Sequence, residues 1–120
     1  MINSHRDLVI WQSGIELAVH IYRMTRSFPT FERYGLASQL QRAASSIPAN
    51  IAEGHGRRTK GDFRRSLAIA RGSAAELSTH LALANRLGYI SKEMLDEFED
   101  EAGLVARRIT VLIRRLPRSR

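Results

Sequence analysis

The sequence predicts an all-α protein, an antiparallel up-down-up-down bundle of four helices. Apolar residues recur at alternating three- and four-residue steps along four segments, which is the helical period. Glycine, proline and helix-capping residues separate these segments at short connections, and such connections favour antiparallel neighbours. With 120 residues, of which 43% are hydrophobic, the chain is long enough for one core. We therefore expect a single domain, 1–120.

The first helix, about 7–27, carries two apolar stripes. Phe28 and Pro29 end it, because a residue before proline is pushed out of helical geometry. One stripe consists of Leu8, Trp11, Ile15, Ala18 and Tyr22, and the second of Ile10, Leu17, Ile21 and Met24. The two together are wider than an outer helix of a bundle needs. This excess predicts that another copy of the chain covers part of the helix.

The second helix, about 32–54, has an inward face that continues to Ile51, with Pro48 inside the pattern. Proline removes one backbone donor, so we expect a kink near 44–46, with the freed carbonyl bound by Ser45, Ser46 or water. Two short helices are the alternative. Gly54 and Gly56 are expected to end the helix.

The third helix, about 60–87, keeps a heptad rhythm from Phe63 to Ala84, and Thr59 to Asp62 resembles a capping box at its start. Small residues around Gly72 and Ala74 predict close packing against a neighbour. Gly88 ends this helix, and Ser91 caps the fourth, about 91–116.

The formal charge of +7 and the pI near 11.0 suggest polyanionic partners. An acidic block at 93–101 precedes an arginine-rich end, which partly reflects the helix dipole. No cysteine is present, so a disulfide framework and a thiolate zinc site are excluded and a reducing compartment is allowed. Neither a signal peptide nor a membrane span is expected, and we predict a cytoplasmic protein.

Two motifs are specific: FPTFERYGLASQLQRAASSIPANIAEGHGRRTKGDF, residues 28–63, and ARGSAAEL, residues 70–77. They resemble the four-helix bundle proteins encoded in intervening sequences of bacterial 23S ribosomal RNA genes. The likeness extends over about 7–116. One departure is Gln41, where the family usually has an arginine beside Arg42, which thins the basic face of the second helix.

The resemblance implies a ring of bundles, often a homopentamer, and no known activity. A related branch is the accessory protein of diversity-generating retroelements, which partners a reverse transcriptase. That analogy suggests nucleic acid or a polymerase as partner, although fold similarity does not settle function.

A surface rich in arginine is a candidate site for RNA or DNA, because arginine pairs bidentately with phosphate. Solvated faces and ion pairs between protomers are the alternative interpretation. The segment 53–60 could also hold a phosphate, but we favour a glycine-terminated helix and a solvated turn. The candidate nucleic-acid-binding residues are Arg57, Arg58, Lys60, Arg64, Arg65, Arg71, Arg107, Arg108, Arg114 and Arg115.

Several motif residues fall on or beside inward faces and are interpreted as structural. We expect Asn50 to satisfy backbone groups loosened by Pro48, and Glu53 or Glu76 to pair with Arg42 or Arg71. The alternative interpretation is a catalytic pair of carboxylates, but the sequence shows no nucleophile or acid/base set to accompany it. The structural set is Arg42, Pro48, Asn50, Glu53, Gly54 and Glu76.

The four histidines lack metal-ligand spacing, so we expect no catalytic residues, metal or cofactor. Aromatic residues are expected in the core, which disfavours reading of single-stranded bases; these are Trp11, Tyr22, Phe63 and Phe98. The first hypothesis is a non-enzymatic homo-oligomer that binds RNA or DNA. The second is an adaptor or assembly subunit that binds another protein.

Overall fold

The computed structural model describes residues 4–57 and 59–117, and within them four α-helices and no strand are found. The helices are α1 (Val9–Thr25), α2 (Leu36–His55), α3 (Lys60–Arg86) and α4 (Lys92–Arg115), with short 3-10 helices η1 (His5–Asp7) and η2 (Thr30–Glu32). The predicted all-α bundle of four helices is therefore confirmed. None of the described helices is long and apolar enough to cross a membrane.

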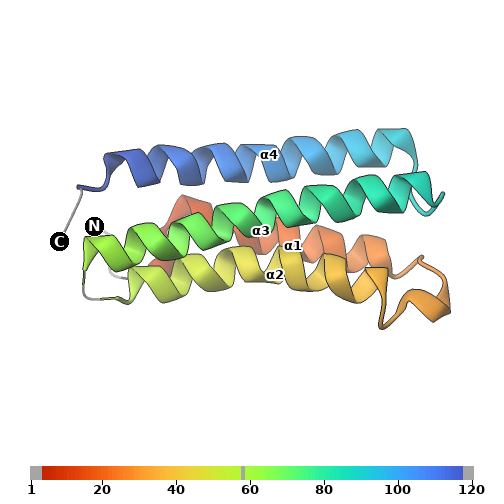
Figure 1. Cartoon of the computed structure of the whole chain (residues 1–120), viewed down its shortest axis with the longest axis horizontal. Helices are drawn as coiled ribbons and strands as arrows, with labels where there is room; N and C mark the ends of the chain where they lie inside the picture. Colours follow the sequence, from red (N-terminus) through yellow and green to blue (C-terminus); the bar gives the residue numbers. More distant parts are fainter. Residues whose placement is uncertain (1–3, 58, 118–120) are drawn as a thin grey trace.

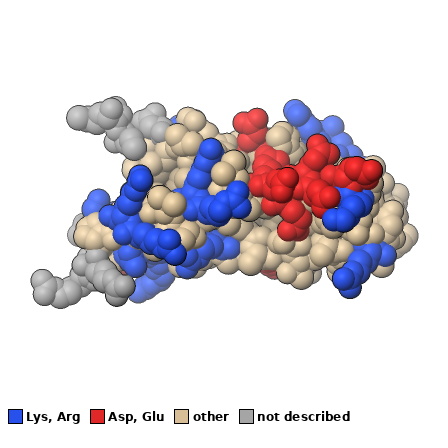
Figure 2. Space-filling model, turned by 90° about the horizontal axis from the view of Figure 1, so that it is seen from above, with Lys and Arg blue, Asp and Glu red and all other residues tan. Residues whose placement is uncertain are grey.

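The molecule is elongated, with extents of 46 × 25 × 22 Å. The α1–α2 and α3–α4 connections lie at one end, and the α2–α3 connection lies at the other, together with both termini of the described chain (Figure 1). Figure 2 shows the molecule from above, with its long axis again horizontal. Helix α3 packs extensively on α2 and on α4, whereas α4 contacts α1 much less. Hollows lined by both helices lie along the seam between α1 and α4.

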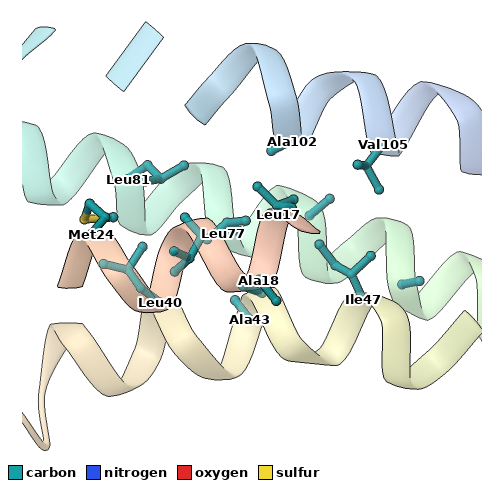
Figure 3. Packing of buried hydrophobic residues seen from close by; sticks show 14 of the residues in the cluster. Leu17, Ala18, Met24, Leu40, Ala43, Ile47, Leu77, Leu81, Ala102 and Val105 are labelled. Carbon is teal, nitrogen blue, oxygen red and sulfur yellow. The ribbon is translucent and has the colours of Figure 1, made fainter. Parts of the chain in front are cut away.

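The core comes from all four helices, as Figure 3 shows for Leu17, Leu40, Leu77 and Val105. These side chains are at most 2% exposed. The predicted heptad positions Leu67, Ala70, Ala74, Leu77, Leu81 and Ala84 of α3 are all buried. Of the two stripes on α1, the second is buried throughout, at Ile10, Leu17, Ile21 and Met24. The other stripe reaches the surface at Ile15 and Tyr22.

Helix α2 begins at Leu36, about four residues after the predicted start. The reason is Glu32, whose Oε1 accepts a hydrogen bond from the backbone N–H of Leu36 at 2.9 Å. Its Oε2 accepts another from the Tyr89 hydroxyl at 2.8 Å. These two donors lower the pKa of Glu32, the backbone donor most, and the same hydrogen bond raises the pKa of Tyr89. One carboxylate thus caps α2 and ties its start to the α3–α4 connection.

Pro48 is buried inside α2, which continues unbroken to His55, so the alternative of two short helices is wrong. The kink stays a prediction. Asn50 binds the backbone close to Pro48: its Nδ2 donates to the Ser46 carbonyl at 2.8 Å. The carbonyl that Pro48 deprives of its donor, however, belongs to Ala44. Asn50 also donates to Ser46 Oγ, which is 2.8 Å from Ser73 Oγ on α3.

Two glycines have other roles than predicted. Gly54 does not end α2; it is buried within the last turn, and a Cβ there would lie 2.6 Å from Ser66 Cβ on α3. Gly54 therefore permits close approach of α2 and α3. Gly72 is exposed, with nothing within 4 Å of a built Cβ, so close packing does not explain it. Gly88, with φ of 84°, follows α3 in the left-handed conformation that favours glycine.

The predicted N-caps of the last two helices are confirmed. Thr59 Oγ1 accepts a hydrogen bond from the Asp62 N–H at 3.0 Å, and Ser91 Oγ accepts one from the Met94 N–H at 3.1 Å. Each bond satisfies a backbone donor that the first helical turn leaves without a partner. These caps fix where α3 and α4 begin, and hence where their arginines lie.

Candidate nucleic-acid interface

Positive charge gathers at the end of the bundle that holds the α2–α3 connection and the C-terminus of α4. Figure 2 shows lysine and arginine side chains on this half, the acidic side chains farther along the molecule, and further lysine and arginine side chains at the opposite end. We call the exposed cations there the basic end, namely Arg57, Lys60, Arg65, Arg114 and Arg115. They come from the α2–α3 connection, α3 and α4, so the fold brings together residues that are far apart in the sequence.

Most cations of the basic end have no anionic partner. Among the described residues only Arg57 forms an ion pair there, 3.7 Å from Glu53 Oε1, with both side chains more than half exposed. An exposed pair of this kind contributes little and is easily exchanged for another anion. Lys60, Arg65 and Arg114 form no ion pair within the described chain. Their charge is available to a phosphate.

Arg64 has a structural role that the sequence did not indicate. Its Nη1 donates to the backbone carbonyls of Ile113 and of Leu116, the latter at 3.1 Å, at the C-terminus of α4. Carbonyls in the last turn of a helix have no partner within that helix, and a cation there complements the dipole. Arg64 is half-buried, so we remove it from the candidate surface and assign it to joining α3 to α4.

Arg71, Arg107 and Arg108 lie nearer the middle of the molecule. Arg71 Nη1 donates to Thr110 Oγ1 at 3.3 Å, and Arg108 Nη1 donates to Ser13 Oγ at 3.1 Å. All three arginines are exposed, so these single hydrogen bonds leave them accessible. Arg58 lies outside the described residues.

The motif carboxylates and Arg42 are exposed, which contradicts their expected inward positions. The expected pairing with Arg42 or Arg71 is wrong. Glu53 pairs with Arg57, and Glu76 Oε2 lies 3.7 Å from His80 Nε2, each with a residue four positions along the chain. A charged side chain beside an apolar stripe can turn to solvent at little cost, so no buried partner is needed.

An apolar cleft of about 350 Å³ lies between α1 and α4 beside the basic end. Val9, Ile10 and Val111 contribute to its apolar lining, and its rim carries Arg107, Arg108 and Arg115. Val9 is 61% exposed and Val111 is 45% exposed. Part of the apolar surface of α1 is therefore uncovered at this cleft, at a residue outside the two predicted stripes, and it adjoins candidate arginines. Within the described residues, no cluster of metal-binding side chains is found.

Aromatic residues divide differently from the prediction. Trp11, Phe63 and Phe98 are partly buried against the core, as expected. Tyr22 is 46% exposed, which corrects its assignment to the core. Phe31 and Tyr34, which the sequence reasoning did not single out, are 78% and 89% exposed at the α1–α2 connection. The proline and glycine that bracket that segment were the available signal.

The fold and this surface together define a small helical bundle protein with an arginine-rich end and a partly uncovered apolar flank. The family model described as 23S rRNA-intervening sequence protein matches residues 6–111, so the chain belongs to this family.

Among solved structures, the chain is similar to a protein of unknown function from the S23 ribosomal protein family of Bacteroides thetaiotaomicron. The two share 26% sequence identity and a TM-score of 0.79 over 88% of this chain and 98% of the other. No curated protein matches the chain. Neither match indicates an enzymatic family.

Proposed function

We propose that the chain is a non-enzymatic, homo-oligomeric helical protein that binds RNA or DNA through its basic end. The observation that carries this proposal is the gathering of Lys60, Arg65, Arg114 and Arg115 at one end without anionic partners in the described chain. Neutralising several phosphates there releases counterions, which is the main source of affinity that does not depend on base sequence.

The basic end favours the nucleic-acid backbone over the bases. Phe63, the aromatic residue of α3 at this end, is partly buried against the core and forms an edge contact with His55, at 5.8 Å between ring centroids. Because the described residues of the basic end include no exposed aromatic ring, the contacts available are those of guanidinium and ammonium groups with phosphate. The proposal is therefore that duplex or structured nucleic acid binds with little sequence preference.

Salt dependence tests this function directly. Fluorescence anisotropy with a labelled RNA hairpin and a DNA duplex, measured over a range of salt concentrations, yields the number of phosphates that the protein contacts. The double variant Arg114→Gln/Arg115→Gln should weaken binding to both probes and reduce the slope of log K against log[salt] by about 2. Absence of binding, or binding independent of salt, would refute the proposal.

A control variant with the same loss of charge separates the basic end from net charge. Arg23 and Arg86 are exposed and lie outside the basic end, on α1 and in the last turn of α3. Arg23→Gln/Arg86→Gln should leave the slope nearly unchanged. An equal reduction in both double variants would mean that the whole charge, and not this surface, attracts the nucleic acid.

Self-association is the second component of the proposal, and the apolar cleft between α1 and α4 supports it. Exposed valines at positions 9 and 111 are costly to hydrate, and covering them with another copy would remove that cost. Family resemblance suggests a pentamer. Light scattering should give a mass several times the 13.6 kDa of one chain.

Val111→Glu should lower that mass by placing a charge in the cleft. Ile69→Glu, at an equally exposed position on α3 that does not line the cleft, is the control and should leave the mass unchanged. A monomeric mass for the unmodified protein would contradict self-association.

An adaptor that binds another protein, such as a reverse transcriptase, is the alternative function, and the same cleft favours it. Charge at its rim from Arg107 and Arg115 would select an acidic partner. Pull-down from the protein's own cells, with and without nuclease, distinguishes the two functions. A protein partner that is retained after nuclease treatment favours the adaptor, and loss of all partners favours nucleic-acid binding.

We assign no reaction to the chain. A location in the cytoplasm also belongs to the proposal, and the absence of cysteine from the sequence is compatible with it.

A further inference from the structure

A second pocket, of about 480 Å³, lies at the other end of the molecule. The C-terminal part of α1, the connection that follows it and the first turns of α2 form its walls. This end is opposite the basic end (Figure 1). The volume falls within the range of small-molecule sites in proteins. We call it the loop-end pocket.

The loop-end pocket is positively charged. Arg26 and Arg33 both line it, and no carboxylate is found among its described lining residues. Neither arginine forms an ion pair in the described chain. The nearby carboxylate of Glu32 is held elsewhere by the N–H of Leu36 and the hydroxyl of Tyr89. Two unpaired guanidinium groups at one cavity favour a ligand with a phosphate or another anionic group.

A fixed polar pair lies in the same pocket. Thr25 is 5% exposed, and its Oγ1 donates to the Tyr22 carbonyl at 3.0 Å. The same Oγ1 accepts a hydrogen bond from Gln41 Nε2, also at 3.0 Å. Gln41 is therefore held by one end of its amide, and its carbonyl oxygen has no hydrogen-bond partner in the described chain. That oxygen can accept a hydrogen bond from a ligand N–H or O–H.

An aromatic ring completes the lining. Tyr22 borders the pocket and is 46% exposed, so part of its side chain is accessible to a ligand. Phe31 and Tyr34, in the connection between α1 and α2, are also exposed at this end but do not line the pocket. Exposed aromatic residues next to arginine are the combination on which nucleotide bases stack while their phosphates are bound.

We infer that the loop-end pocket binds a nucleotide unit, with its phosphate on Arg26 and Arg33 and its base stacked on Tyr22. The amide of Gln41 supplies a hydrogen-bonding edge. Cations, an accessible tyrosine and an oriented amide meet in one cavity of suitable volume, whereas no exposed aromatic ring is found among the described residues of the basic end. The pocket is therefore a site separate from the proposed nucleic-acid surface, and its occupation does not depend on that surface.

The test uses the full chain and AMP as the probe, with binding followed by calorimetry and by NMR shifts. Binding should be detectable at or below about 1 mM AMP at low salt. Arg33→Gln and Tyr22→Ala should each weaken it about tenfold, because a charge-assisted contact and a stacking contact are lost. Tyr22→Phe should retain most of the affinity, since the ring remains.

Two control variants make the same kind of substitution, loss of an arginine or loss of a tyrosine ring, at positions outside the pocket. Arg23→Gln removes a cation from α1 that does not line the pocket, and Tyr34→Ala removes an exposed ring outside it. Both should leave AMP affinity within about twofold of the unmodified protein. No binding of AMP or of a 5′-phosphorylated oligonucleotide, or equal losses in pocket and control variants, would overturn the inference.

The source of the nucleotide is decided by a second probe. A short single-stranded oligonucleotide with a 5′-phosphate should bind more tightly than its 5′-hydroxyl counterpart and than AMP if the pocket takes a strand end. Tighter binding of AMP than of the 5′-phosphorylated strand would support a free nucleotide. In both cases Arg33→Gln should remove the difference in affinity between the tighter-binding and the weaker-binding probe. The salt-dependent binding of duplex at the basic end should stay unchanged.

Discussion

The same substitution, glycine to alanine, should have opposite effects at two positions of this bundle. At Gly54, the added Cβ would lie 2.6 Å from Ser66 Cβ and 3.0 Å from Phe63 Cδ1 on α3. An ordinary contact between such atoms is about 3.5–4.0 Å, so an overlap of about 1 Å must be relieved. Because a Cβ is fixed to the backbone, α2 and α3 have to move apart.

The magnitude follows from two opposing terms. Overpacking of this kind costs about 1–3 kcal/mol, whereas replacing glycine within a helix returns at most about 1 kcal/mol. Gly54→Ala should therefore destabilise the protein by about 1–2 kcal/mol and lower Tm by about 4–8 °C. At Gly72 only the favourable term remains, since nothing lies within 4 Å of the new Cβ. Gly72→Ala should stabilise by about 1 kcal/mol.

Thermal and urea unfolding of the two variants, followed by circular dichroism, measure these changes. A double-mutant cycle with Ser66→Gly isolates the contact, because removal of the Ser66 side chain should recover part of the cost of Gly54→Ala. If Gly54→Ala raises Tm as much as Gly72→Ala does, the close approach of α2 and α3 is not as described and the reasoning fails.

Three further predictions concern single side chains. The ionised Glu32 carboxylate should stabilise the fold above the ordinary pKa of a glutamate, and this contribution should be lost as the pH falls through the lowered folded-state pKa. Glu32→Gln should abolish this pH-dependent contribution. Equal acid unfolding profiles of the two proteins would contradict the role of the Glu32 carboxylate as the cap of α2. Ala74→Leu should cost about 1–3 kcal/mol, since Ala74 is 4% exposed, and unchanged denaturant unfolding would show that this position tolerates volume. Arg64→Met keeps the apolar stem but removes the donors to the carbonyls at the end of α4; we expect a loss of about 1–2 kcal/mol and faster hydrogen exchange in the last turn of α4, and exchange as slow as in the unmodified protein would exclude the capping role.

The helical periodicity was sufficient to predict α3 and α4. Thr59 and Ser91 are short polar residues that bind backbone N–H groups of the first turn, and this chemistry is local. The start of α2 was predicted too early because its cap is Glu32, four residues before the bonded N–H, and the carboxylate is held in place by Tyr89 from a distant connection. A cap that depends on a long-range contact leaves no local signal.

Most residues of the candidate site could be predicted from the sequence, but which of them lie together in space could not. Arginine composition indicated a basic surface, and the structure places the start of α3 beside the end of α4 (Figure 1). The sequence could not show that Arg64 and Arg65 have different roles. Only the packing of α3 on α4 determines that the side chain of Arg64 is the one that reaches the carbonyls of α4. Tyr22 was misassigned for a similar reason: its position on a stripe is apolar, but its side chain borders the loop-end pocket and is 46% exposed.

The sequence by itself determined that the chain is helical, where α3 and α4 begin, that its charge is positive and that α1 has more apolar surface than one bundle covers. These properties depend on residues within one or two turns of each other, or on composition. Only the tertiary structure decided which of the two stripes of α1 is buried, that Gly54 serves packing and Gly72 does not, and that Arg26, Arg33 and Tyr22 meet in one pocket. Each of these depends on the distance and rotation between helices, which arise from the packing of side chains that are far apart in the chain.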